Sequence, residues 1–224
     1  MISLDFLVRS ENDEIKFIEK TLDLDRCKLK GIIEKVSLYE NKYNYKKYVL
    51  KVNSYFSKEE EILSYCYKFN IKNVSTIKNY YYSKLLENKY LVLNYIEGNT
   101  LYDYLVNFNS TLVFKMRIFK QILNIVLQLH SHNLVHNDLL LKNIILNKSN
   151  TIYLIDFGIS FFDLTREKIH KKRDIKSLGI ILYYLVYENE NNFKKLDLNV
   201  YYDKIIYNCN IGNYNIEDLV RLFE

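Results

Sequence analysis

Two short polar motifs in the second half of the chain carry residue types that could do chemistry together. The first is His136-x-Asp138 with Asn143 five residues after Asp138, and the second is a Phe-Gly pair directly after Asp156. Asp156 follows an apolar run and can supply a fixed carboxylate, while Asn143 adds a neutral oxygen, so the two suit Mg²⁺, which takes oxygen ligands. Asp138, on the same loop as Asn143, would face a hydroxyl group as proton acceptor.

A lysine in the first half of the chain is a further candidate. Lys51 stands in the apolar run 49–52, where a buried ammonium group is costly unless it meets an anion. Three consecutive glutamates, Glu59, Glu60 and Glu61, follow and could supply a carboxylate. The residues alone leave the choice among the three open, and a solvated acidic helix start is the plainer interpretation.

Hydropathy patterns predict the elements that must position these residues. In the first half, strands are expected at 29–33, 35–39, 48–52 and 90–96. A helix over 57–68 would begin at Ser57, with a capping box to Glu60. Residues 1–26 receive no assignment.

The same patterns predict that the second half is mostly helical. Apolar residues at 3.6-residue spacing predict a long amphipathic helix over 111–132. The other elements expected here are a short helix from about Thr100, strands at 144–146 and 152–155, a helix over 173–187 and a small helix at 216–223. The two short strands would form a hairpin between the two polar motifs.

With this spacing, hairpin and long helix, the chain resembles the protein kinase superfamily. The resemblance covers about residues 28–187 and includes the catalytic-loop pattern, the Asp-Phe-Gly triplet and the strand lysine. It implies an α+β, bilobal protein kinase-like fold. Residues 1–94 would form a small antiparallel-sheet N-lobe that includes the unplaced segment. Residues 95–224 would form a reduced helical C-lobe, truncated after the helix at about 173–187.

The resemblance gives each candidate residue a role in phosphoryl transfer, which needs positioning and charge stabilisation more than covalent chemistry. Lys51, steadied by Glu59, would hold the α- and β-phosphates of ATP. Asn143 and Asp156 would bind Mg²⁺. Asp138 would position the acceptor hydroxyl.

The implied nucleotide site also takes residues from the first half. Leu63 fits the family's spine position four residues after Glu59, which favours Glu59 over its neighbours. The run 91–98 resembles the hinge strand that carries adenine. The implied ATP-binding residues are Gly31, Val36, Lys51, Leu93, Asn94, Tyr95 and Ile96. Gly31 alone matches the three glycine positions of the Gly-rich loop, so weaker nucleotide binding is expected.

Two further residues receive supporting roles from the resemblance. His136 is expected to stack near Phe157 and not to act as a catalyst. Asp174 resembles the aspartate at the start of a helix that anchors the catalytic loop.

The chain departs from the common pattern in three places. Asn137 stands where the family has the arginine that reads an activation-loop phosphate, so that regulation is expected to be absent. Leu140 stands where ordinary Ser/Thr kinases have lysine. Asp174 follows Asp156 by only eighteen residues, which leaves no room for a full activation segment or an A-P-E motif.

The short connection is similar to one compact branch, the small atypical kinase/ATPase subunit of the KEOPS complex. That family supports threonylcarbamoyladenosine modification of tRNA. The resemblance implies ATP and Mg²⁺ as cofactors, a Kae1-like protein and other KEOPS subunits as partners, and indirect contact with tRNA. The alternatives are a divergent or viral-type, stand-alone Ser/Thr protein kinase, a small-molecule or lipid-sugar kinase of related fold and a non-catalytic pseudokinase scaffold.

A basic cluster follows the Asp-Phe-Gly triplet and could grip phosphates or an acidic partner. Its members are Arg166, Lys168, His170, Lys171, Lys172 and Arg173. A solvated loop in a lysine-rich protein is the plainer interpretation.

Composition narrows the class of protein. Apolar residues make up 49% of the 224, too many for a disordered chain, and the absence of proline excludes collagen-like and proline-rich segments. The net charge of +5 is too modest to indicate a nucleic-acid partner. Three scattered cysteines, no signal peptide and no membrane-length apolar run favour a cytoplasmic or nuclear location.

Overall fold

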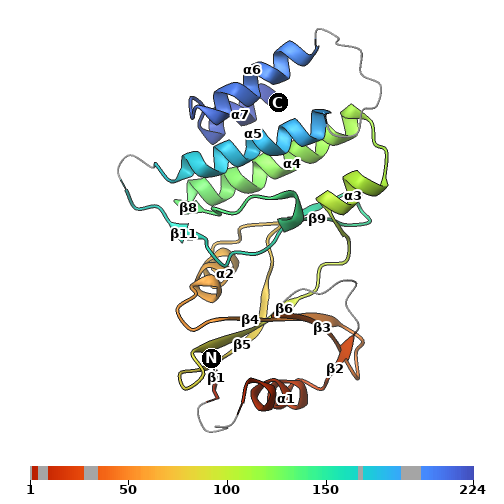
Figure 1. Cartoon of the computed structure of the whole chain (residues 1–224), viewed down its shortest axis with the longest axis vertical. Helices are drawn as coiled ribbons and strands as arrows, with labels where there is room; N and C mark the ends of the chain where they lie inside the picture. The colour runs from red at the N-terminus through yellow and green to blue at the C-terminus, as the bar shows by residue number, and fades with distance from the viewer. Residues whose placement is uncertain (1, 5–9, 28–34, 166–168, 188–197) are drawn as a thin grey trace. The chain divides into compact units, whose positions relative to one another are not determined.

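The computed structural model describes residues 2–4, 10–27, 35–165, 169–187 and 198–224. The chain divides into two compact units (Figure 1). One contains Met1–Tyr67 and Ser75–Tyr95, and the other contains Lys68–Val74 and Ile96–Glu224. A mainly antiparallel sheet dominates the first unit and helices dominate the second, which confirms the expected α+β class.

A six-stranded sheet forms the first unit. Its strands, in spatial order, are β1 (Ile2–Ser3), β5 (Ile77–Ser83), β6 (Asn88–Asn94), β4 (Lys47–Ser54), β3 (Val36–Asn41) and β2 (Leu24–Cys27). β1 runs parallel to β5, and all other neighbours are antiparallel. Side chains alternate between the two faces of a strand, so in β4 the buried Leu50 and Val52 point away from the face that carries Lys51.

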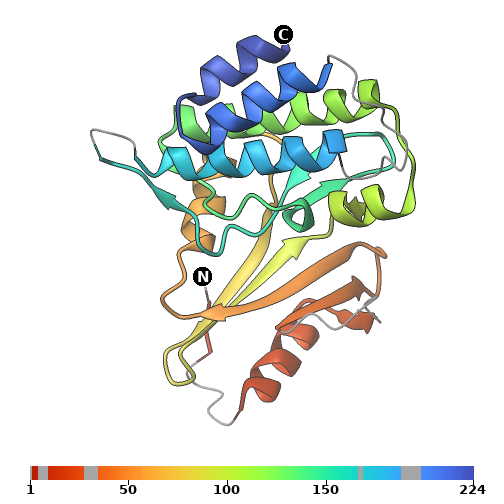
Figure 2. The same ribbon diagram turned by 45° about the horizontal axis from the view of Figure 1, so that its top comes forward.

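Helix α1 (Glu11–Thr21) occupies the segment to which the sequence patterns assigned nothing (Figure 2). Ser10 caps it by accepting the Asp13 N–H group. Ile18 is fully buried and belongs to the same apolar core as the β4 residues. Buried Glu14 accepts a hydrogen bond from the hydroxyl of Tyr90 (2.6 Å). Helix α1 is therefore an integral layer of the first unit.

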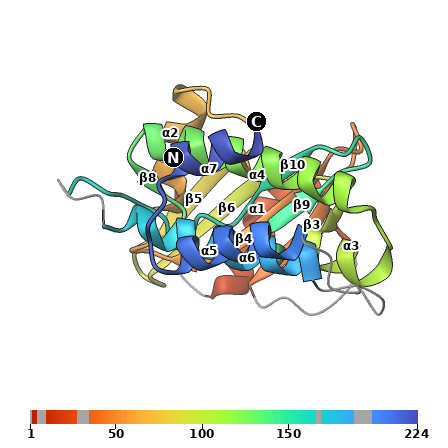
Figure 3. The same ribbon diagram turned by 90° about the horizontal axis from the view of Figure 1, so that it is seen from above.

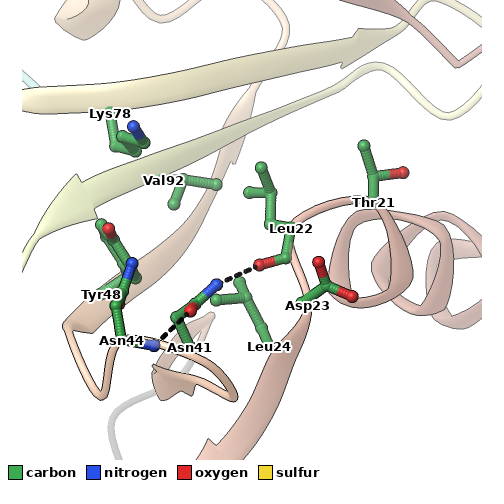
Figure 4. Close-up of a pocket in the computed structure, with 9 residues that line it drawn as sticks. All are labelled: Thr21, Leu22, Asp23, Leu24, Asn41, Asn44, Tyr48, Lys78 and Val92. Atoms are coloured by element: carbon green, nitrogen blue, oxygen red, sulfur yellow. Dashed lines mark hydrogen bonds between the residues drawn. The ribbon is translucent and has the colours of Figure 1, made fainter.

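The end of α1 is tied to the β3–β4 turn (Figure 4). The Asn41 amide donates to the Leu22 carbonyl (2.9 Å), and its oxygen accepts the Asn44 N–H (3.0 Å). One asparagine side chain thus joins the helix end to a sheet turn, and this fixes the path of the chain into β2.

Helix α2 (Glu59–Lys68) begins two residues later than predicted, and the expected capping box does not form. The Ser57 hydroxyl accepts the Glu59 N–H (3.3 Å), but the Glu60 carboxylate forms an ion pair with Lys89. An ammonium group is the stronger partner for a carboxylate, so the ion pair replaces the predicted box.

The second unit contains most of the helices and the short strands. Its elements are β7 (Asn99–Thr100), α3 (Leu101–Asn107), α4 (Leu112–Ser131), β8 (Leu134–Val135), the 3₁₀ turn η1 (Leu141–Asn143), β9 (Ile144–Leu146), β10 (Ile152–Leu154), β11 (Phe161–Phe162), α5 (Lys171–Tyr187), α6 (Leu198–Asn210) and α7 (Ile216–Phe223). The predicted long helix, hairpin strands and last helix are confirmed. Helix α5 begins two residues before the predicted start.

The helices of this unit pack in pairs (Figure 3). Helix α4 contacts α5 and α7, and α5 also contacts α6. A Cβ atom on Gly179 would lie 2.7 Å from that of Cys209, so only glycine allows α5 and α6 to approach this closely. Helix α6 was not predicted, because its asparagine-rich sequence has little intrinsic signal and tertiary packing supports it instead.

Candidate functional site

The first unit holds Lys51 beside one of the three candidate glutamates. Lys51 Nζ lies 2.7 Å from Glu59 Oε2, and the Glu59 side chain is completely buried. The Asn53 amide donates to the same carboxylate oxygen (2.7 Å). Glu59, and not Glu60 or Glu61, is therefore the carboxylate that β4 and α2 hold against Lys51.

Other residues predicted to bind ATP lie around β4. Val36 is the direct cross-strand partner of Lys51. The N–H group of Asn94 donates to the Thr76 carbonyl (2.9 Å), and that of Tyr95 donates to the Lys47 carbonyl (3.2 Å). Leu93 is buried near the end of β6.

Two positions of the predicted nucleotide site remain. Gly31 falls outside the described residues. Ile96 follows the hydrogen-bonded pair Asn94 and Tyr95, and its N–H group has no hydrogen-bond partner among the residues that the structure describes. Of the backbone N–H groups of residues 94–96, that of Ile96 is the donor left for a ligand.

The second unit brings Asp138 and Asn143 into direct contact. The Asn143 side-chain nitrogen donates to the Asp138 carboxylate (2.8 Å) and to its backbone carbonyl (2.9 Å). The Asp138 carboxylate is therefore held in place, and the amide oxygen is the group that Asn143 can offer to a ligand.

The β9–β10 hairpin places Asp156 near Asn143. Ile144 pairs with Leu154, and the N–H group of Ile155 donates to the Asn143 carbonyl (2.9 Å). Asp156 follows directly, with a left-handed φ of 65°, a conformation that aspartate tolerates better than most residues. Its carboxylate accepts the Gly158 N–H (3.3 Å). The predicted magnesium ligands therefore leave the same end of one hairpin.

His136 has the packing position expected of it. Its ring meets that of Phe157 edge-to-face, with centroids 4.7 Å apart. Nδ1 accepts the Asp138 N–H (3.3 Å), so Nε2 carries the proton and donates to the Ile155 carbonyl (3.1 Å). Burial lowers the pKa of His136 below 6.5, which keeps this neutral tautomer.

Asp174 anchors the loop, as predicted. Its fully buried carboxylate accepts the N–H groups of His136 (2.9 Å) and Asn137 (2.8 Å). A third contact joins it to Nε2 of His130 (2.9 Å), a buried side chain that the sequence reasoning missed. The signal was available, because His130 lies in the last turn of the predicted amphipathic helix, on its buried side.

The departure directly before Asp138 has a structural explanation. Asn137 has a φ of 67°, and asparagine is among the residues that most readily adopt this left-handed conformation. Its amide oxygen accepts a hydrogen bond from Nη1 of Arg173 (3.0 Å). Arg173 thus brings a guanidinium group next to the position at which the chain lacks the usual arginine.

The basic cluster separates into residues with different surroundings. Lys171 donates to the His130 carbonyl and to the Asn133 side chain, so it ties α5 to the end of α4. The His170 ring packs edge-to-face on Phe161. Lys172 and Arg173 are exposed, while Arg166 and Lys168 lie outside the described residues.

The donor set of the second unit suits Mg²⁺. No group of three His, Cys, Asp or Glu side chains among the described residues could hold a metal ion by itself. Mg²⁺ does not need such a cage, because one or two carboxylates are enough when phosphate oxygens and water complete the coordination shell. The Asp156 carboxylate and the Asn143 amide oxygen fit that requirement.

A cavity of about 240 Å³ lies elsewhere, between the end of α1 and the sheet (Figure 4). It is lined by Thr21, Leu22, Asp23, Leu24, Asn41, Asn44, Tyr48, Lys78 and Val92. None of the predicted site residues lines it. Across the parts of the chain that the structure describes, no helix is long and apolar enough to cross a bilayer.

Comparisons with known proteins match the middle of the chain. A family model described as "Protein kinase domain" matches residues 30–162, more than half of the chain. The chain is 29% identical over 137 residues to the probable serine/threonine-protein kinase KIN1 homolog of Encephalitozoon cuniculi, a match that covers 51% of this chain and 24% of the relative. It is 38% identical over 102 residues to the probable serine/threonine-protein kinase mkcE of Dictyostelium discoideum, which covers 46% and 14%.

A viral relative matches over a larger share of its own length. The chain is 30% identical over 148 residues to serine/threonine-protein kinase 1 of Heliothis zea nuclear polyhedrosis virus, a match that covers 55% of each protein. The chain therefore spans from about one seventh to about half of the length of these three relatives.

Proposed function

Because the chain belongs to the protein kinase domain family, we propose that it transfers the γ-phosphate of ATP to serine or threonine hydroxyl groups of proteins. The observation that carries the proposal is the catalytic loop of the second unit. There Asp138 and Asn143 are hydrogen-bonded to each other, and a buried carboxylate, that of Asp174, holds the loop backbone.

The two units would contribute different residues to phosphate transfer. In the first unit, Lys51 would bind the α- and β-phosphates, and Glu59 would keep the ammonium group in position. The Ile96 N–H group, which belongs to the second unit and follows the engaged N–H groups of Asn94 and Tyr95, would bond the adenine ring. Val36 and Leu93 would contact the nucleotide through their apolar side chains.

In the second unit, Asn143 and Asp156 would be the protein ligands of Mg²⁺, which when bound neutralises charge on the phosphate oxygens. The hydrogen bonds from Asn143 fix the Asp138 carboxylate before substrate arrives. Asp138 would then accept a hydrogen bond from the substrate hydroxyl, orient its oxygen and take its proton.

A role of the KEOPS type is a second hypothesis and rests on the short segment between Asp156 and Asp174. The three relatives described above are named as Ser/Thr protein kinases, and these names support the Ser/Thr protein kinase function instead. Co-purification separates the two. A KEOPS-type subunit would retain a Kae1-like protein and gain activity from it, whereas a stand-alone kinase would phosphorylate a generic protein substrate without help.

Nucleotide binding tests the assignment of the metal ligands. The thermal midpoint of the wild-type protein should rise when ATP and Mg²⁺ are added together, because a ligand at 100 times its Kd stabilises the folded state by about 2.7 kcal/mol. Asp156→Ala should lose the part of this rise that depends on Mg²⁺ and should lose ATP turnover. Glu217→Ala, which removes an exposed carboxylate from α7, is the matched control and should behave as wild type. Equal turnover by Asp156→Ala would rule the mechanism out.

A further inference from the structure

Apolar side chains flank Asp138 on the surface of the second unit. Leu140, two residues beyond Asp138, is 50% exposed, and Ile159 is 57% exposed. The carbonyl of Ile159 accepts a hydrogen bond from the Asn137 side chain (3.3 Å), which ties Ile159 to the residue just before Asp138. Two large exposed apolar side chains therefore belong to residues that are linked to Asp138, one two positions along the chain and the other through a hydrogen bond to its neighbour.

A cation stands at the same place. Nη1 of Arg173 lies 3.0 Å from the Asn137 amide oxygen. A guanidinium group has five N–H donors, and this is the one hydrogen bond that the Arg173 side chain makes to the described part of the chain. The carboxylate of Asp163 is buried and already accepts hydrogen bonds from Thr165 and from the His170 N–H.

The other cations close to the loop are less available. Lys171 is engaged by the His130 carbonyl and the Asn133 side chain. Lys142 Nζ lies 5.3 Å from the centroid of the Tyr102 ring, where a cation–π contact holds it. Arg173 is thus the exposed cation best placed to pair with a substrate beside Asp138.

We propose that the substrate is an extended protein segment of acidic and apolar character. Its acceptor residue would adjoin an apolar side chain that covers Leu140 and Ile159, and an Asp or Glu residue would pair with Arg173. The inference rests on the proposed kinase function and adds the substrate class. Complementary charge selects partners mainly by rejecting the wrong sign, so a basic segment would be repelled at this surface.

Three synthetic peptides with one threonine acceptor test the proposal on the full chain with ATP and Mg²⁺. The first flanks the threonine with leucine and carries Asp and Glu on both sides, the second replaces the acidic residues by lysine, and the third replaces leucine by serine. We expect kcat/KM for the first peptide to exceed that for the second about tenfold, one step of the affinity scale. It should exceed that for the third about fivefold, as expected for partial burial of an apolar side chain.

Charge reversal identifies the residue responsible. Arg173→Glu should bring the acidic-to-basic ratio to about one or invert it. Lys204→Glu makes the same change of net charge at an exposed position of α6 and should leave the tenfold ratio intact. Equal rates for the first two peptides, or a ratio that Arg173→Glu does not change, would overturn the proposal.

A binding measurement keeps the two hypotheses separate. Fluorescence anisotropy of the labelled peptides, without ATP, gives the same comparison when no phosphate is transferred. A preference for the acidic peptide in binding without any transfer would contradict the kinase function and retain the substrate surface. Transfer to all peptides at one rate would contradict the substrate surface and retain the kinase function.

Discussion

The carboxylate of Asp174 is the most instructive single group to alter, because it is buried and holds the backbone of the proposed catalytic loop. Oδ1 accepts the Asn137 N–H, and Oδ2 accepts the His136 N–H and contacts His130 Nε2. Asp174→Asn keeps the volume of the side chain and replaces one oxygen by a donor. In the cheaper orientation the remaining oxygen takes the Oδ2 position, so the Asn137 N–H loses its acceptor.

The cost follows from these three hydrogen bonds. An amide N–H group left without a partner costs about 1–3 kcal/mol. The two remaining hydrogen bonds change from charge-assisted to neutral, at about 1 kcal/mol each. The free energy of unfolding should therefore fall by about 3–5 kcal/mol, a large share of the 5–15 kcal/mol that stabilises an ordinary domain.

Urea unfolding followed by circular dichroism measures this loss, and phosphate transfer measured below the unfolding transition reports on the loop. Transfer should fall at least tenfold in molecules that remain folded. Glu217→Gln removes an exposed carboxylate and should change the unfolding free energy by less than about 1 kcal/mol. A loss below 1 kcal/mol in Asp174→Asn, with unchanged transfer, would refute the anchoring role.

Three further outcomes are expected. Lys51→Met removes the ammonium group beside buried Glu59 and should lower the free energy of unfolding in urea by about 3 kcal/mol. The double variant Lys51→Met/Glu59→Gln should recover part of this loss, because it also removes the buried charge. Equal stability of the single and double variants would contradict the pairing. Burial holds the pKa of His136 below 6.5. Below pH 6.5 the unfolded chain therefore binds a proton at His136 more readily than the folded chain does. Thermal unfolding should show full stability above pH 6.5 and a loss of at most about 1.4 kcal/mol per pH unit below it, a slope that His136→Asn reduces. Ile18→Ala should destabilise the chain by about 2–5 kcal/mol, and a loss under 1 kcal/mol would show that α1 is not part of the core.

Local patterns were sufficient for the second unit's central elements. The spacing of apolar residues identified α4, and the alternation of apolar runs with the polar turn 147–150 identified the β9–β10 hairpin. Because that hairpin joins Asn143 to Asp156, the short spacing of the two motifs was enough to predict that these two residues lie close together. The packing of His136 on Phe157 followed from the resemblance and is confirmed.

Other features depend on contacts that the sequence does not display. Helix α1 has a short apolar stripe at Ile15 and Ile18, which Leu22 extends just past its end, and it forms because the face of a sheet lies beneath it. Helix α6 needs Gly179 on a different helix to reach its packing distance. Three adjacent glutamates could have formed the ion pairs of the first unit. The angular position of each on α2 determines that Glu59 pairs with Lys51 and Glu60 with Lys89.

Phosphate transfer by Asp138→Asn tests the central claim most directly. The side chain keeps its size, lies outside the group assigned to Mg²⁺, and loses the ability to accept a proton. With γ-labelled ATP, Mg²⁺ and a protein substrate, the wild-type protein should label serine or threonine. Asp138→Asn should bind ATP with Mg²⁺ as the wild-type protein does, but it should label the substrate at least a hundredfold more slowly. Equal labelling by the two proteins, or none by wild type with ATP bound, would contradict the account.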